Sequence, residues 1–193
     1  MKQFLLSLVL LAALSSSAQV TYGPKLGLNF SKITFSSNQH KGSFKAGAFF
    51  GGYLNYAVNN NFSVQPELYY SMEGGKDKSN LSSSSGVINS GFLHLPVLLK
   101  YTAASGFFGE AGPQLGFLLS NKEKWNGTKV DIKEYYKSIE FRFPIGVGYK
   151  FSNAVSADLR YSAGFSAINK DAVNGGKLKN KVFSLGLQYN MTK

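Results

Sequence analysis

Residues 139–149 read Ile-Glu-Phe-Arg-Phe-Pro-Ile-Gly-Val-Gly-Tyr, and every odd position carries an apolar or aromatic side chain. The even positions carry Glu140, Arg142, a proline and two glycines. Successive side chains of a β-strand point to opposite faces. The stretch therefore predicts a strand with one oily face and one charged, glycine-rich face.

The same alternation recurs along the chain, at 22–31, 44–56, 62–72, 93–101, 107–117, 155–163 and 183–189. None of the eight apolar faces contains a charged residue. The best helical candidate, 122–137, is polar on every face and contains Asn126-Gly127. The pattern predicts an all-β protein of eight antiparallel strands.

The N-terminus predicts export. Lys2 precedes an apolar run at 4–14 and a small-residue stretch that ends at Ala18. This run is shorter than the about 20 residues that a membrane-spanning helix needs, so we interpret residues 1–18 as a signal peptide. Residues 19–193 then form a single β-barrel domain.

Composition excludes several kinds of chemistry. The chain has no cysteine, which removes disulfides, thiol nucleophiles and cysteine-ligated metals. No phosphate-binding loop, nucleotide fingerprint or zinc-protease motif occurs, so we expect no cofactor and no metal.

Alternation alone does not say which face points outward, because a soluble barrel has its apolar face inside. Aromatic residues at the strand ends favour the inverse arrangement, since rings suit a lipid–water boundary. One tier comprises Tyr22, Tyr56, Phe62, Tyr101, Phe107, Tyr149 and Tyr189, and the other Phe30, Phe44, Tyr70, Phe117 and Phe183.

The connections between strands alternate in length. Those at 57–61, 102–106 and 151–154 are tight turns, whereas those at 32–43, 74–91, 120–138 and 164–181 are long. Short turns at one end and long loops at the other are typical of an outer-membrane barrel with periplasmic termini.

Ten charges lie on the polar faces of the predicted strands. They are Lys25, Lys45, Glu67, Glu73, Lys100, Glu110, Glu140, Arg142, Asp158 and Arg160, five basic and five acidic. An eight-stranded barrel is just wide enough for its own side chains to fill it. Unpaired charges in such a lumen are costly, so we expect a network of ion pairs.

Four segments carry a family resemblance: 25–31 (KLGLNFS), 93–101 (LHLPVLLKY), 109–116 (GEAGPQLG) and 158–164 (DLRYSAG). They resemble the small outer-membrane β-barrel domain proteins known as porin family or PorT-like proteins. The resemblance implies an eight-stranded transmembrane barrel in the bacterial outer membrane, with some members associated with protein secretion. An outer-membrane strand often ends on an aromatic residue that the assembly machinery recognises, and here Tyr189 is followed by four more residues.

The net charge of +11 first suggests nucleic acid, but the ten lumen charges sum to zero. The excess therefore falls on loops and termini, and we expect no nucleic acid partner. The loop cations are Lys76, Lys78, Lys122, Lys124, Lys129, Lys133, Lys137, Lys170, Lys177, Lys179 and Lys181. Lysines without arginine indicate diffuse attraction to polyanionic lipid headgroups such as lipopolysaccharide, or mere solubility.

His94 is the one inward residue with catalytic potential, and a lipid-modifying enzyme that uses it is one alternative. A narrow porin-like channel and a soluble periplasmic ligand-binding barrel are two others. We favour a non-enzymatic outer-membrane barrel with a structural, surface-interaction, secretion or transport role, and partners among membrane lipids and envelope proteins.

Overall fold

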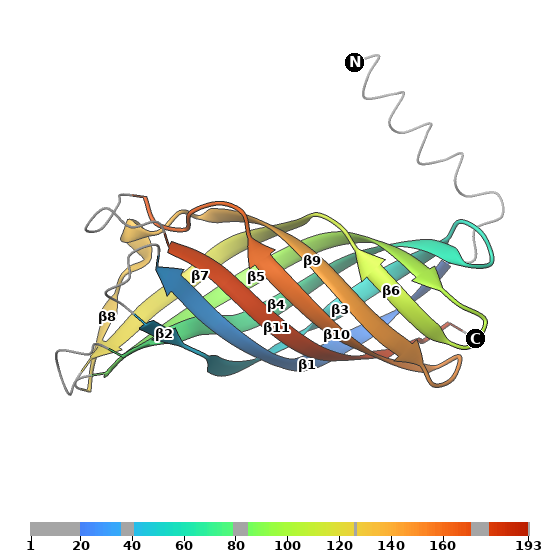
Figure 1. The fold of residues 1–193 in the computed structure, drawn as a ribbon, viewed down its shortest axis with the longest axis horizontal. Helices are drawn as coiled ribbons and strands as arrows, with labels where there is room; N and C mark the ends of the chain where they lie inside the picture. Colours follow the sequence, from blue (N-terminus) through green and yellow to red (C-terminus); the bar gives the residue numbers. More distant parts are fainter. Residues whose placement is uncertain (1–19, 36–40, 79–84, 126, 171–177, 193) are drawn as a thin grey trace, which may run out of the picture.

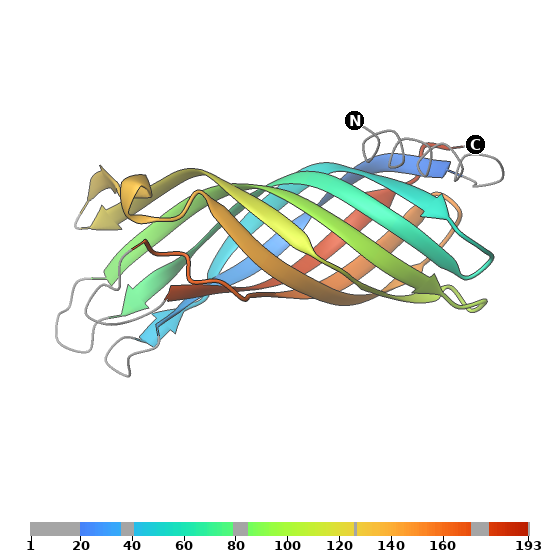
Figure 2. The ribbon, with the colours of Figure 1, turned by 90° about the horizontal axis from the view of Figure 1, so that it is seen from above.

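The computed structural model describes residues 20–35, 41–78, 85–125, 127–170 and 178–192. Within this part of the chain, all strands belong to one antiparallel sheet that closes on itself into an elongated barrel (Figure 1). The strands are strongly tilted to the long axis of the barrel, as a view from above also shows (Figure 2).

The elements follow one another as β1 (Val20–Phe35), β2 (Lys41–Ser43), β3 (Lys45–Ala57), β4 (Phe62–Lys78), β5 (Ser85–Thr102), β6 (Phe107–Ala111), β7 (Gln114–Trp125), β8 (Thr128–Asp131), the 3-10 turn η1 (Lys133–Tyr135), β9 (Ile139–Lys150), β10 (Val155–Gly164) and β11 (Leu178–Tyr189). None of the helical segments in the described residues is long and apolar enough to cross a membrane.

The ring runs β1, β3, β4, β5, β6 with β7, β9, β10 and β11, and β11 pairs with β1 to close it. β2 continues the line of β3 beyond Phe44, and β6 and β7 are one strand interrupted at Gly112 and Pro113. β8 folds back on the end of β7 as a hairpin. The predicted eight-stranded antiparallel barrel is therefore confirmed.

Several strands extend beyond the predicted apolar segments. β4 continues to Lys78, β5 begins at Ser85, and β7 continues to Trp125. These extensions lie at the long-loop end, where β2 and β8 are also found (Figure 1). Backbone pairing continues there although the outward positions no longer form a regular apolar face, so the alternation that marks a strand in the sequence disappears before the strand ends.

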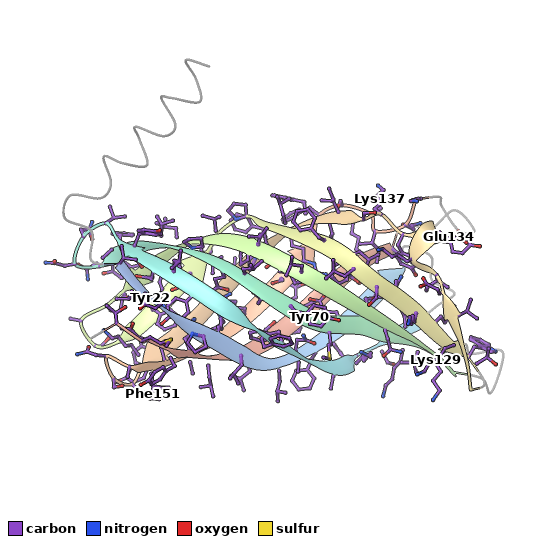
Figure 3. All side chains as sticks on the ribbon, turned by 180° about the vertical axis from the view of Figure 1, so that it is seen from behind. Tyr22, Tyr70, Lys129, Glu134, Lys137 and Phe151 are labelled. Atoms are coloured by element: carbon purple, nitrogen blue, oxygen red, sulfur yellow. The ribbon has the colours of Figure 1, made fainter. Side chains whose placement is uncertain are left out.

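The apolar faces point outward. Lys25 is 1% exposed, whereas its neighbour Leu26 is 56% exposed, and the same contrast continues along every strand of the ring. Figure 3 shows rings and aliphatic side chains projecting from the barrel wall along its length. A soluble ligand-binding barrel buries its apolar face, so this alternative is inconsistent with the structure.

Candidate functional site: the lumen and its two ion-pair networks

A polar vestibule of ≈620 Å³ lies inside the short-turn end of the barrel. Its wall includes Asn55, Ser63 and Gln188, and Lys100 and Phe108 also line it. The described lining residues include Lys100 and Lys150 but no carboxylate. The vestibule is thus a basic, amide-rich space.

Five charged side chains form an inner network within the barrel: Lys25, Glu67, Glu110, Asp158 and Arg160. Arg160 binds Glu67 through two guanidinium nitrogens, at 2.6 and 2.7 Å, and its Nε also contacts Glu110. Lys25 Nζ lies 3.3 Å from Glu67 Oε1 and 3.0 Å from Asp158 Oδ2. All five residues are at least 95% buried, so they pair with one another rather than with water; Glu110 Oε2 is the one carboxylate oxygen of this network that has no hydrogen-bond partner among the described residues.

Neutral amides complete the inner network on its vestibule side. Gln65 donates to Glu67 at 2.7 Å, and Gln188 donates to Asp158 at 3.0 Å. Lys100 lies directly opposite Glu110 in the β5–β6 ladder, and its Nζ is 3.6 Å from the centre of the Phe108 ring. The cation therefore rests on an aromatic face in addition to its 3.5 Å contact with Gln65.

An outer network lies further toward the long-loop end and is built on Glu73, His94, Glu140 and Arg142. Arg142 binds Glu73 through two nitrogens, at 3.1 and 2.6 Å, and reaches Glu140 at 2.9 Å. Glu67 and Glu73 are six residues apart on β4, which corresponds to about 20 Å along a strand. The two networks are therefore separate tiers.

His94 is fully buried and belongs to the outer network. Gln114 donates its Nε2 proton to Nδ1 of His94 at 3.0 Å, while its Oε1 accepts from the Tyr69 hydroxyl. Nδ1 is then an acceptor, so Nε2 carries the proton that His94 donates to Glu73 at 2.9 Å. His94 is a satisfied structural histidine in this arrangement, and its ring stacks on Phe92 at 5.4 Å.

An apolar cap closes the lumen at the long-loop end. Ile33, Ile88, Ile168 and Leu178 pack together there, with Tyr136 against them. Backbone hydrogen bonds fix the segment around Ile168, whose carbonyl accepts from the amide of Lys137 at 2.8 Å. Burial raises the pKa of Tyr136 to about 12, so this side chain stays neutral in the cap at physiological pH.

The structure places all ten predicted lumen charges on the inward side of the barrel. Eight of them form ion pairs; of the other two, Lys45 donates to the carbonyl of Glu73 at 3.1 Å and Lys100 makes the contacts described above. The expected single network is instead two tiers. Without Lys100, the formal charge of the inner network is −1, and without Lys45, that of the outer network is −1 with His94 neutral. Each tier therefore reaches a net charge of zero only when its additional lysine is included.

Sequence reasoning missed the aromatic residues of the lumen. Phe49, Phe92 and Phe108 are buried, and Tyr69 lies between the two networks with its ring 5.4 Å from Phe49 and 5.2 Å from His94. The signal was present as adjacent aromatic pairs such as Phe49-Phe50, since one member of any such pair in a strand must point inward.

The twelve predicted girdle aromatics all lie on the outer surface. Nine are exposed, and Tyr70, Phe117 and Tyr149 are half-buried by neighbours. Figure 3 shows Tyr22 at the short-turn end, together with Phe151, and Tyr70 on the barrel wall. Rings pair across strands, as in Phe62 with Tyr101 at 5.0 Å.

The assignment of the lysines to loops needs correction. Strands, not loops, hold most of them, because pairing extends beyond the apolar segments: Lys76 and Lys78 are in β4, Lys122 and Lys124 in β7, Lys129 in β8, Lys133 in η1, and Lys179 and Lys181 in β11. Lys137 and Lys170 lie in connections, and Lys177 and the signal segment 1–18 lie outside the described residues. Lys129 and Lys137 mark the long-loop end in Figure 3.

An apolar outer wall, aromatic tiers and a lumen filled by ion pairs define a transmembrane β-barrel protein. The family model for the outer membrane protein beta-barrel domain matches residues 13–169. The chain therefore belongs to the outer-membrane β-barrel domain family, and bacterial outer membrane is the location that this family indicates.

Solved barrels support the fold. Neisserial surface protein A superposes with a TM-score of 0.56 and 14% sequence identity, covering 89% of this chain and 98% of its own. The attachment invasion locus protein of Yersinia pestis gives a TM-score of 0.52 and 13% identity, covering 90% of this chain and 99% of its own. No curated protein sequence matches the chain.

Proposed function

We propose that this protein is a closed, non-enzymatic barrel of the outer membrane that acts through its surface, in envelope structure, surface interaction or a secretion or transport assembly. The observation that carries the proposal is the filled lumen. The inner network, Tyr69, the outer network and the apolar cap follow one another along the barrel, and their buried side chains occupy its interior.

The orientation in the membrane is part of the proposal. Residues 1–18 direct export and are removed, both termini of the mature chain face the periplasm, and the long-loop end faces outward. The described residues support this orientation, because β1 begins and β11 ends at the short-turn end, where Met191 donates to the carbonyl of Tyr22. The resemblance to porin family and PorT-like proteins is compatible with a secretion-associated role.

The environment of His94 argues against an enzyme. Both ring nitrogens are engaged, one by Glu73 and one by Gln114, and the side chain is fully buried between the networks. Two hydroxyls belong to this system, and both are engaged: that of Ser71 is bonded to Glu73 and that of Tyr69 to Gln114. A general base needs access to the proton that it removes, and this histidine has none from the outer leaflet.

The exposed lysines at the long-loop end supply the partner surface. Lys122, Lys124, Lys129, Lys137 and Lys170 are exposed and project where a polyanionic leaflet and its neighbours would meet the protein. Their charge favours lipopolysaccharide and acidic envelope proteins as partners.

The test combines location with conductance. A heat-modifiable band in an outer-membrane fraction, with no single-channel steps from the purified protein in planar bilayers, is expected. Steady ionic conductance would favour the narrow channel, and extraction without detergent would contradict the membrane assignment itself. A crosslinking pulldown from intact cells identifies the partner.

A further inference from the structure

The outward side chains of β1 and β11 form a regular series of rungs. The cross-strand partners are Leu26 with Leu187, Leu28 with Leu185, Phe30 with Phe183, and then Lys32 with Lys181. The last apolar rung is therefore aromatic, and the next one consists of two lysines. Two residues along a strand correspond to about 7 Å, so the cations lie immediately beyond the end of the apolar wall.

The lysine rung places two like charges opposite each other. Like charges directly opposite each other in an antiparallel pair are destabilising. Within the part of the chain that the structure describes, neither Lys32 nor Lys181 has an ion-pair partner. In the lumen, by contrast, each arginine binds carboxylates. The rung thus places two lysines opposite each other with no carboxylate partner among the described residues.

An aromatic groove adjoins the two cations. It measures ≈370 Å³ and is lined by Lys32, Thr34, Phe44, Tyr161, Lys181 and Phe183. The three rings form a row, with Phe183 6.1 Å from Phe44 and 4.8 Å from Tyr161. Lys32 Nζ lies 5.7 Å from the Phe44 ring, so the ammonium is already directed over the groove.

We propose that Lys32 and Lys181 form a clamp for the phosphate group of an outer-leaflet lipid, whose acyl chain lies along Phe44, Phe183 and Tyr161. A membrane lipid carries its phosphate directly above its acyl chains, and the lysine rung has the same relation to the aromatic groove. Two compact ammonium groups suit a phosphate, and an interfacial position strengthens their attraction beyond its value in water.

The clamp rests on the proposed membrane orientation, which places this end of the wall in the outer leaflet. The clamp differs from the diffuse attraction of the other lysines, because it requires two lysines and an aromatic groove at one site, binding the phosphate and the acyl chain of the same lipid. Lys124 and Lys129 provide the comparison. They are also exposed cross-strand partners, but they lie on the β7–β8 hairpin, beyond the ring of strands.

The experiment is a lipid titration of the full-length protein in non-ionic detergent, followed by native mass spectrometry. The probes are phosphorylated lipid A, the same lipid after enzymatic dephosphorylation, and inorganic phosphate. K32Q/K181Q is expected to weaken binding of phosphorylated lipid A about 25-fold, since each lysine near a lipid phosphate contributes about fivefold. K124Q/K129Q is expected to bind phosphorylated lipid A with the affinity of the wild type. Dephosphorylated lipid A is expected to bind the wild type only as weakly as phosphorylated lipid A binds K32Q/K181Q.

If K32Q/K181Q and K124Q/K129Q lose the same affinity for phosphorylated lipid A, the clamp is refuted and diffuse attraction explains the binding. Undiminished binding of dephosphorylated lipid would overturn the role of phosphate, and equally tight binding of inorganic phosphate would overturn the role of the rings. Heat-modifiable mobility of every variant reports folding. If the wild type is found in the outer membrane in a heat-modifiable form and K32Q/K181Q binds phosphorylated lipid A as tightly as the wild type does, only the clamp is refuted. If the wild type is not found in the outer membrane, the proposed function is refuted as well.

Discussion

Replacing Arg160 by methionine tests whether the inner network stabilises the barrel. The substitution removes both bonds to Glu67, at 2.6 and 2.7 Å, and the contacts with Glu110 and Asp158. Glu67 and Asp158 then retain only Lys25 as an ion-pair partner among the described residues, and Glu110 retains only Lys100, which lies opposite it in the β5–β6 ladder. Removing one partner of a buried ion pair costs about 3–5 kcal/mol, because it leaves an uncompensated buried charge.

The assay is equilibrium unfolding in urea of the protein refolded into lipid vesicles, with the folded fraction measured by heat-modifiable mobility. With a slope of about 2 kcal/mol per molar urea, a loss of about 4 kcal/mol lowers the midpoint by about 2 M. The control is K150M, which removes an exposed cation near the vestibule and is expected to shift the midpoint little.

The double variant R160M/E67Q supplies the decisive comparison. Neutralising Glu67 removes one of the stranded charges, so the double variant is expected to be more stable than R160M alone. The reasoning is refuted if R160M unfolds at the same urea concentration as K150M, or if adding E67Q to R160M destabilises the barrel further.

The remaining predictions concern the outer half of the lumen. H94Q is expected to cost less than about 1 kcal/mol because a glutamine amide can still donate to Glu73, and to leave lipid A composition unchanged; altered lipid A by mass spectrometry would contradict the structural role of His94. G116A places a Cβ 2.8 Å from the His94 ring and is expected to cost about 1–3 kcal/mol, whereas G109A meets nothing within 4 Å and serves as its control; equal urea midpoints would contradict the close packing. I168S is expected to raise amide hydrogen exchange around the cap more than at the short-turn end, since it puts a hydroxyl among apolar neighbours, and uniform exchange would show that the cap is not a local unit.

The fold could be predicted because the barrel imposes a period of two on every strand. Each residue of 139–149 has a face assigned by its parity, and the structure keeps that parity from Glu140 to Gly148. Odd or even position no longer tells which side chains point inward once a β-bulge adds a residue to a strand. In β7 the register shifts opposite Gly91, so Leu118 and Asn121 are both buried although they differ by an odd number of residues.

The contents of the lumen could be predicted only as a set. The inward charges follow from parity, but which carboxylate meets which guanidinium depends on the stagger between strands, and no local pattern records it. Glu67 therefore pairs with Arg160, which is 93 positions away, and Arg142 turns to Glu73 rather than to the inner tier. The strand extensions also escaped prediction, since polar segments such as 76–78 carry no apolar face.

The inner network also constrains the order of assembly. Arg160 is on β10 and Glu67 on β4, and until β1 pairs with β11 the strands that connect them are β5, β6 with β7, and β9. In an open, flat sheet, four strand spacings of about 4.8 Å would hold these two strands about 19 Å apart. The side chains meet only once β1 and β11 have paired. An open sheet in the hydrocarbon layer would therefore contain Arg160 and Glu67 as unpaired charges. Insertion into the bilayer and pairing of β1 with β11 must therefore proceed together.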